Sequence, residues 1–206
     1  MFPTSSSSRI ALAGLLVAAA VTACGRESDA RVDGSEGGDA SAASLRSIRE
    51  APPFELETLD GDTLTLAALD SVPVILMNFW ASWCGPCKVE IPDLMVLHEA
   101  YGSKGFMVLG VTVNDLPRDS RDFADEIEMS YRSVIGTPQM LEAYELSPWL
   151  PTSLLIKDGQ VVKEWVGPRS RDEFEYPVKV ALGLAPAAAD LMQDVEEVRG
   201  RDGDGR

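Results

Sequence analysis

Two cysteines separated by two residues are the strongest chemical signal in this sequence. Cys84 and Cys87 follow a nearly continuous apolar run, 72–80, and open a predicted helix that reaches about residue 101. This spacing brings both sulfurs within bonding reach at the helix start, where free N–H groups and partial positive charge stabilise a thiolate. We expect Cys84 to be the exposed nucleophile of thiol–disulfide exchange and Cys87, a turn inside the helix, to be the resolving thiol. Pro86 suits the first helical turn because its missing N–H is not needed there.

The cysteine pair has two other interpretations. It could be half of a metal site, but structural zinc usually takes four Cys or His ligands, and the chain has no second pair and only one histidine, His98. We expect His98 to be an exposed helix residue. The pair could also be a structural disulfide, but so short a loop gains little chain entropy. We therefore predict a redox pair with no metal and no cofactor.

The elements around the pair follow from hydrophobic periodicity and turn residues. Apolar and polar residues alternate in the segments 54–57 and 64–66, and Asp60-Gly61-Asp62 lies between them. This pattern predicts a β-hairpin. Buried strands are expected at 72–80 and 106–113, a short strand at 131–135, and two further strands at 152–156 and 161–166, joined by a tight turn at 157–160. Helices are expected at 84–101, at 118–129 with Asp119 or Ser120 as cap, at 138–144, and after a Ser170–Glu173 capping box, with Pro177 shortening or kinking the last one. This order predicts an α/β fold whose central mixed sheet is covered on both faces, with an N-terminal hairpin extension.

The residues around the cysteines resemble a known active site. The stretch 80–88, WASWCGPCK, is similar to the active site of thioredoxin, and the pattern over about 52–167 resembles the TlpA/ResA-like family of membrane-tethered, thioredoxin-like oxidoreductases. Pro92, five residues after Cys87, matches a helix-kinking proline of that family. The segment 147–153 resembles the loop that holds its cis-proline. The resemblance implies a thioredoxin-like fold and thiol–disulfide oxidoreductase activity.

Glu90 matches an acidic active-site residue of the ResA-like proteins. It lies three residues after Cys87, so the two side chains share a helix face. Glu90 could accept the Cys87 proton or keep that thiol protonated; alternatively, it is an ordinary solvated carboxylate. Thioredoxin has a titratable Asp where this chain has Asn78, which shifts the proton-handling role toward Glu90.

The resemblance also implies a substrate-binding face, formed by Trp83, Gly85, Pro86, Leu150 and Pro151. X–Pro bonds are usually trans, with about 5–6% cis in folded proteins, but the family pattern implies a cis bond before Pro151. A cis turn there would leave the Leu150 main chain free to pair with an extended substrate peptide. Trp80 is expected to pack in the core. Trp149 is either a substrate-loop aromatic or core filler.

The N-terminal region predicts export and anchoring. Residues 10–22 are apolar but too short to span a bilayer, which takes about 20 residues, and the following Cys24 completes a pattern that resembles the bacterial lipobox. We predict a lipoprotein signal peptide at 1–23, a lipid anchor on Cys24, a flexible linker over 24–51, a thioredoxin-like domain over 52–184 and an acidic, disordered tail over 185–206. A plain signal peptide with a chance cysteine and a cytoplasmic protein with an apolar start are the alternatives.

The expected function combines these observations. The net charge of −15 argues against nucleic-acid binding. We expect an envelope-anchored dithiol reductase that faces the periplasm or another extracytoplasmic space and acts on disulfide-containing proteins. The family resemblance adds apocytochrome c as a substrate and a membrane thiol-transfer protein as electron donor. A disulfide oxidase or isomerase, or a non-catalytic metal-handling lipoprotein, are the alternatives; Gly85-Pro86 argues against the oxidase because it resembles thioredoxin, which is reducing at about −270 mV.

Overall fold

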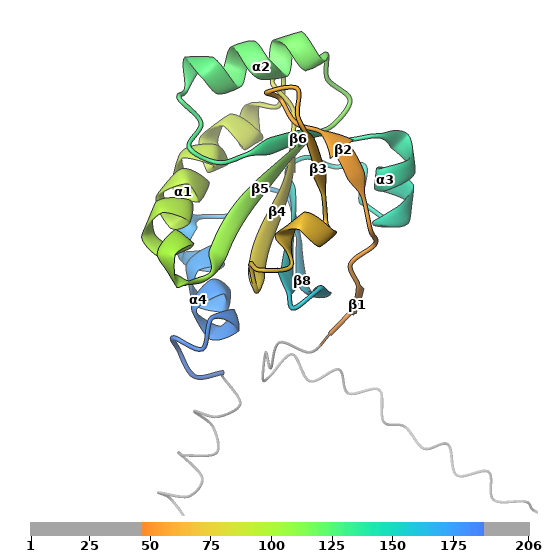
Figure 1. The fold of residues 1–206 in the computed structure, drawn as a ribbon. Coiled ribbons are helices and arrows are strands. Elements are labelled where there is room, and N and C mark those ends of the chain that lie inside the picture. The colour runs from red at the N-terminus through yellow and green to blue at the C-terminus, as the bar shows by residue number, and fades with distance from the viewer. Residues whose placement is uncertain (1–46, 188–206) are drawn as a thin grey trace, which may run out of the picture. The chain divides into compact units, whose positions relative to one another are not determined.

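A six-stranded mixed β-sheet forms the centre of the fold (Figure 1). The computed structural model describes residues 47–187, and the structural statements below concern that part of the chain. The strand order is β1-β8-β7-β4-β5-β6, with β4–β5 and β5–β6 parallel and the other neighbours antiparallel. The strands are β1 (Arg49–Glu50), β4 (Val74–Trp80), β5 (Phe106–Thr112), β6 (Ser133–Ile135), β7 (Thr152–Lys157) and β8 (Gln160–Val166).

The central strand β4 is buried along its whole length, as its apolar run predicts. Alternate side chains enter two different cores: Leu76 and Trp80 face one, and Met77 and Phe79 face the other. Side chains of α1, α2 and α4 fill the first core, and those of α3 and the hairpin fill the second. These helices are α1 (Gly85–Tyr101), α2 (Pro117–Glu126), α3 (Pro138–Ala143) and α4 (Arg171–Ala181). The predicted central mixed sheet with helices on both faces is confirmed.

The N-terminal hairpin forms a separate two-stranded sheet of β2 (Glu55–Glu57) and β3 (Thr63–Thr65). Leu56 and Leu64 face each other across it and are buried against the second core. The turn uses Gly61 at a φ of +90°, where a residue with a Cβ would be strained. The hairpin is therefore the extension that the sequence predicted, and a one-turn 3-10 helix, Ala67–Leu69, connects it to β4.

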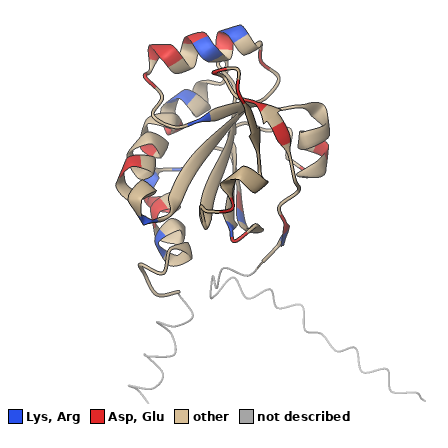
Figure 2. Cartoon of the chain, in the orientation of Figure 1, with Lys and Arg blue, Asp and Glu red and all other residues tan. Residues whose placement is uncertain are grey.

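Charged residues are found mainly on the helices and loops (Figure 2). Strands β4 and β5 carry none, and β7 carries only its last residue, Lys157. In the described residues, no helix is both long enough and apolar enough to cross a membrane. The expected signal peptide, its Cys24 anchor and most of the acidic tail lie outside the described residues.

The structure corrects the expected linker boundary, the start of α2 and the exposure of His98. The linker was expected to reach residue 51, but Arg49–Glu50 pair with β8 and Ala51 is buried. The edge of β8 offers main-chain hydrogen-bond partners to this segment, and a strand of two residues has no recognisable sequence pattern. Helix α2 begins at Pro117 instead of being capped by Asp119 or Ser120, since proline suits the first helical position. His98 is half-buried, not exposed: its Nδ1 accepts the Val108 N–H at 3.2 Å, and burial lowers its pKa.

Helix α4 follows the predicted capping box. The Glu173 carboxylate accepts the N–H and the hydroxyl of Ser170 across the first turn, each at 3.0 Å. Pro177 is buried inside α4, which continues to Ala181, so the expected shortening of this helix is wrong. Helix α4 packs against α1, and the Arg171 N–H at its start donates to the Asp93 carboxylate of α1 at 3.2 Å.

Candidate active site

The cysteine pair forms a disulfide at the N-terminus of α1. Cys84 is the N-cap residue with extended backbone, and its Sγ accepts the Cys87 N–H at 3.2 Å. The two Cα atoms are 5.3 Å apart. Pro86 lies in the first turn of α1, and a Cβ built on Gly85 would meet no atom within 4 Å, so the helix start is sterically open.

The two cysteine residues differ less in exposure than the sequence suggested. Cys87 is completely buried and Cys84 is 4% exposed, so the expected exposed nucleophile is nearly covered in the disulfide state. The physical reason is that the Cys84 side chain turns back as the helix cap and is bonded to Cys87. The order of the two still favours Cys84 as the sulfur that a substrate reaches. An N–H directed at its Sγ and the helix dipole would both stabilise its thiolate.

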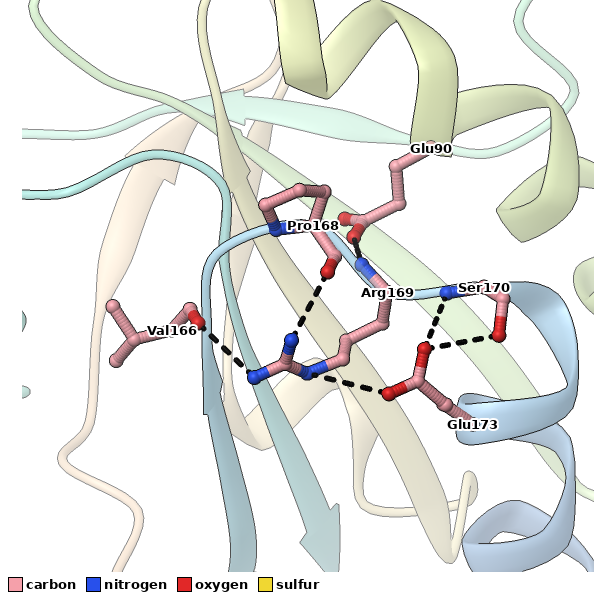
Figure 3. A network of polar contacts seen from close by, with 6 residues as sticks. All are labelled: Glu90, Val166, Pro168, Arg169, Ser170 and Glu173. Atoms are coloured by element: carbon pink, nitrogen blue, oxygen red, sulfur yellow. Dashed lines mark hydrogen bonds and ion pairs between the residues drawn. The ribbon is translucent and has the colours of Figure 1, made fainter.

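Glu90 is buried on α1, with 2% of its surface exposed. Asn78 Nδ2 donates to its Oε1 at 2.8 Å. The Arg169 N–H donates to its Oε2 at 2.7 Å (Figure 3). Burial raises the pKa of Glu90 to about 7, although the hydrogen bonds from Arg169 and Asn78 oppose the rise. The alternative of a solvated helix carboxylate is therefore wrong, and this group can gain or lose a proton near neutral pH.

The loop between β8 and α4 holds the donor to Glu90 in place (Figure 3). The Arg169 guanidinium donates to the carbonyls of Pro168 and Val166 and pairs with Glu173 at 3.8 Å. Glu173 in turn accepts from the main chain and hydroxyl of Ser170. These contacts direct the Arg169 N–H at the buried carboxylate.

Asn78 connects the acid to the sheet. It is completely buried in β4, and its Nδ2 also donates to Ser153 Oγ of β7 at 2.9 Å. Its Oδ1 has no hydrogen-bond partner within the described part of the chain. An amide that cannot ionise thus occupies the site where thioredoxin has an Asp, and Glu90 is the titratable group beside it.

The proline loop lies at the same end of the sheet as the disulfide. Phe79 of β4 pairs with Thr152 of β7, so the residues just after β4 and just before β7 leave the sheet together. The Leu150–Pro151 bond is cis, as the family resemblance implied. Trp149 in this loop is 70% exposed, so it is not core filler.

The two tryptophans of the motif have different environments. Trp80 is completely buried and packs against Phe123, whereas Trp83 is 61% exposed beside Cys84. The structure thus brings Trp83, Gly85 and Pro86 to one end of the sheet, where Leu150 and Pro151 also lie. Their role in substrate binding remains a prediction.

Sequence reasoning missed one residue of this site, Asp115. Its carboxylate accepts the Ser82 N–H at 2.6 Å and the Ser82 hydroxyl at 3.0 Å. The signal was available: Asp115 follows β5, which is parallel to β4, and the carboxyl ends of parallel strands meet at one sheet edge. No group of three or more His, Cys, Asp or Glu residues suited to a metal ion occurs within residues 47–187.

A disulfide at a helix start after the central strand, a buried acid on that helix and a cis-proline loop together define a thioredoxin-like thiol–disulfide oxidoreductase. The chain belongs to the AhpC/TSA family, whose sequence model matches residues 48–165. Its curated relatives include proteins named thiol-disulfide oxidoreductase ResA. The one from Bacillus thuringiensis is 32% identical over 133 residues, covering 64% of this chain and 76% of the relative. The one from Bacillus subtilis is 35% identical over 126 residues, covering 60% and 69%.

The fold comparison agrees with the sequence relatives. A crystal structure of a thiol:disulfide interchange protein of the thioredoxin family, from Chlorobium tepidum, superposes with a TM-score of 0.61 at 32% identity. The match covers 66% of this chain and 97% of that one. The resemblance to ResA-like proteins, the thioredoxin-like fold and the thiol–disulfide oxidoreductase activity are therefore confirmed. The structure contains the Cys84–Cys87 disulfide, and its role as the redox group stays a prediction.

Proposed function

We propose that this oxidoreductase is a dithiol reductase of protein disulfides that works outside the cytoplasm, tethered by a lipid on Cys24. The observation that carries the proposal is the buried Glu90, with a pKa raised to about 7 by burial, on the same helix face as the buried Cys87. A proton acceptor of this kind is what the resolving step needs near neutral pH.

Catalysis proceeds in two exchange steps. The Cys84 thiolate attacks one sulfur of the substrate disulfide; that S–S bond breaks, a Cys84–substrate disulfide forms, and the released thiolate takes a proton from solvent. Cys87 then gives its proton to Glu90 and attacks Cys84 Sγ, which releases the second substrate thiolate to be protonated. The substrate gains two electrons and two protons, and Cys84–Cys87 becomes the disulfide. A dithiol donor must reduce it again, and we propose a membrane thiol-transfer protein.

The proposed substrate face consists of exposed Trp83, the open helix start at Gly85 and Pro86, and the loop at Leu150 and Pro151. In the described part of the chain, the main chain of Leu150 makes no hydrogen bond. It is therefore free to pair with an extended substrate segment. Oxidised apocytochrome c is the substrate that the resemblance to ResA-like proteins suggests, since its haem-attachment site is a Cys-x-x-Cys-His sequence.

A trapping experiment tests the assignment of roles. Reduced Cys87→Ser protein, mixed with an oxidised Cys-x-x-Cys-His peptide, should accumulate a mixed disulfide that dithiothreitol releases, because the resolving thiol is missing. Cys84→Ser should accumulate little, and the double variant none. Non-reducing electrophoresis with mass spectrometry identifies the adduct. The reverse pattern, with Cys84→Ser as the better trap, would make Cys87 the nucleophile.

A further inference from the structure

The turn that precedes α1 and contains Cys84 is held by hydrogen bonds from both of its central residues, Ser82 and Trp83. Residues 81–84 form this turn, closed by a hydrogen bond from the Cys84 N–H to the Ala81 carbonyl at 3.0 Å. Ser82 binds the Asp115 carboxylate, and Trp83 Nε1 donates to the Asn114 carbonyl at 2.9 Å. Both partners belong to the loop that follows β5.

Asp115 connects this turn to α2. Its carboxylate accepts four hydrogen bonds: two from the N–H and hydroxyl of Ser82, one from the Leu116 N–H at 3.0 Å and one from the Ser120 hydroxyl at 2.9 Å. Two of the donors thus belong to the active-site turn and two to the start of α2. Hydrogen bonds to a carboxylate are roughly twice as strong as neutral ones. The bonds from Ser82 to Asp115 therefore hold the turn more strongly than the neutral bond from Trp83 to the Asn114 carbonyl.

The position of the turn decides where Cys84 lies. Only residues 81–84 separate the end of β4 from the start of α1, and the helix N–H groups act on Cys84 Sγ only at hydrogen-bond distance. The Val113 N–H also donates to the Trp80 carbonyl at 2.9 Å, so the two loops leave the sheet side by side. A shift of Ser82 would therefore displace both the sulfur and the exposed Trp83.

We propose that Asp115 is a positioning residue for thiol–disulfide exchange, acting through Ser82 to hold Cys84 and Trp83 in their reactive arrangement. A purely structural role is the competing explanation, in which Asp115 serves only to begin α2 through Leu116 and Ser120. Replacing Ser82 or Ser120 by alanine distinguishes these explanations. Each substitution removes one hydroxyl contact to the Asp115 carboxylate, the first from the active-site turn and the second from α2.

The experiment compares Asp115→Ala, Asp115→Asn, Ser82→Ala and Ser120→Ala, with Asp119→Asn as the control. Asp119 lies in the first turn of the same helix, and Asp119→Asn removes the same charge as Asp115→Asn. Within the described residues, the Asp119 carboxylate contacts only the Arg118 guanidinium, at 4.0 Å. The readouts are kcat and KM for insulin disulfide reduction, thermal unfolding, and acrylamide quenching of Trp83 fluorescence in a Trp149→Phe background.

We expect Asp115→Ala to lower kcat/KM at least about tenfold, which corresponds to about 1.4 kcal/mol, and to change the quenching of Trp83. Asp115→Asn keeps one acceptor oxygen. Its kcat/KM and that of Ser82→Ala should lie between the values for Asp115→Ala and the parent. Ser120→Ala and Asp119→Asn should stay within about twofold. The proposal is overturned if Ser82→Ala and Ser120→Ala lose activity equally, if Asp119→Asn matches Asp115→Ala, or if the losses follow only the unfolded fraction. If Asp115→Ala does not fold, Ser82→Ala, Ser120→Ala and Asp115→Asn still distinguish a positioning role from a purely structural one.

Discussion

Replacing Glu90 by Gln should remove a pH dependence from both stability and thiol reactivity. Glu90 has a pKa of about 7 in the folded protein against 4.5 for the unperturbed group, chiefly because it is buried. A carboxyl group with a raised folded pKa contributes full stability below pH 4.5, and that contribution is lost as pH rises through about 7. The difference corresponds to about 3 kcal/mol at 1.36 kcal/mol for each pKa unit.

Glu90 also affects the pKa values of the thiols, because it lies only three residues after Cys87 on α1. Side chains at i and i+3 lie about 5–6 Å apart at their Cβ atoms. An ionised Glu90 carboxylate would disfavour the Cys87 thiolate, because like charges repel. Cys84 is affected in the same direction, and the curves belong to the coupled set of groups. Glu90→Gln should therefore lower the apparent pKa of the Cys84 thiol and slow turnover, because the proton acceptor is lost.

Two measurements check this prediction. Urea unfolding of the oxidised protein between pH 4.5 and 8 should show stability falling with pH in the parent and a much flatter profile in Glu90→Gln. Iodoacetamide alkylation of the reduced protein gives the thiol pKa values. The matched control is Glu99→Gln, which removes an exposed carboxylate from the same helix. Superimposable alkylation curves, together with parallel stability profiles for Glu90→Gln and the parent, would refute the reasoning.

Two further predictions concern the anchor and the core. Cys24→Ser should release the protein from membranes or block its processing, and mass spectrometry of native protein should find lipid on Cys24 and no residues 1–23; an unmodified Cys24 in mature protein would contradict the anchor. Gly110→Ala should lower the unfolding free energy in urea by about 1–3 kcal/mol, because the new Cβ would clash with Ser133 Oγ and lie 2.8 Å from Trp80 Nε1. Gly102→Ala, which meets no atom within 4 Å, should be neutral or slightly stabilising, and equal stability of the two variants would contradict the packing argument.

The parts of the site that sequence could predict are those with local causes. The spacing of Cys84 and Cys87, the proline in the first helical turn and the capping box at Ser170 depend on residues within one or two turns of each other. The resemblance to ResA-like proteins supplied the cis bond at Pro151 and the importance of Glu90. The hairpin was also predictable, since its alternation and its Gly61 turn are contained in a dozen residues.

The parts that sequence missed depend on residues far apart in the chain. Glu90 is held by an N–H from Arg169, 79 residues later, so neither its burial nor its raised pKa could be read from α1. Asp115 is 33 residues from Ser82, and only the parallel pairing of β4 and β5 brings them together. Strand β1 likewise exists because the edge of β8 is available to it. Each miss is a contact that tertiary structure creates.

The central claim, that this oxidoreductase is a reductant, is tested most directly by its reduction potential. The Cys84–Cys87 pair should be equilibrated with glutathione or dithiothreitol redox buffers and the oxidised fraction measured by mass after alkylation. Because Gly85-Pro86 resembles thioredoxin, we expect a potential near about −270 mV. In this two-electron equilibrium about 30 mV is a tenfold change, so the measurement separates the alternatives clearly. A value near about −120 mV, typical of a strong disulfide oxidant, would contradict the reductase and favour the oxidase.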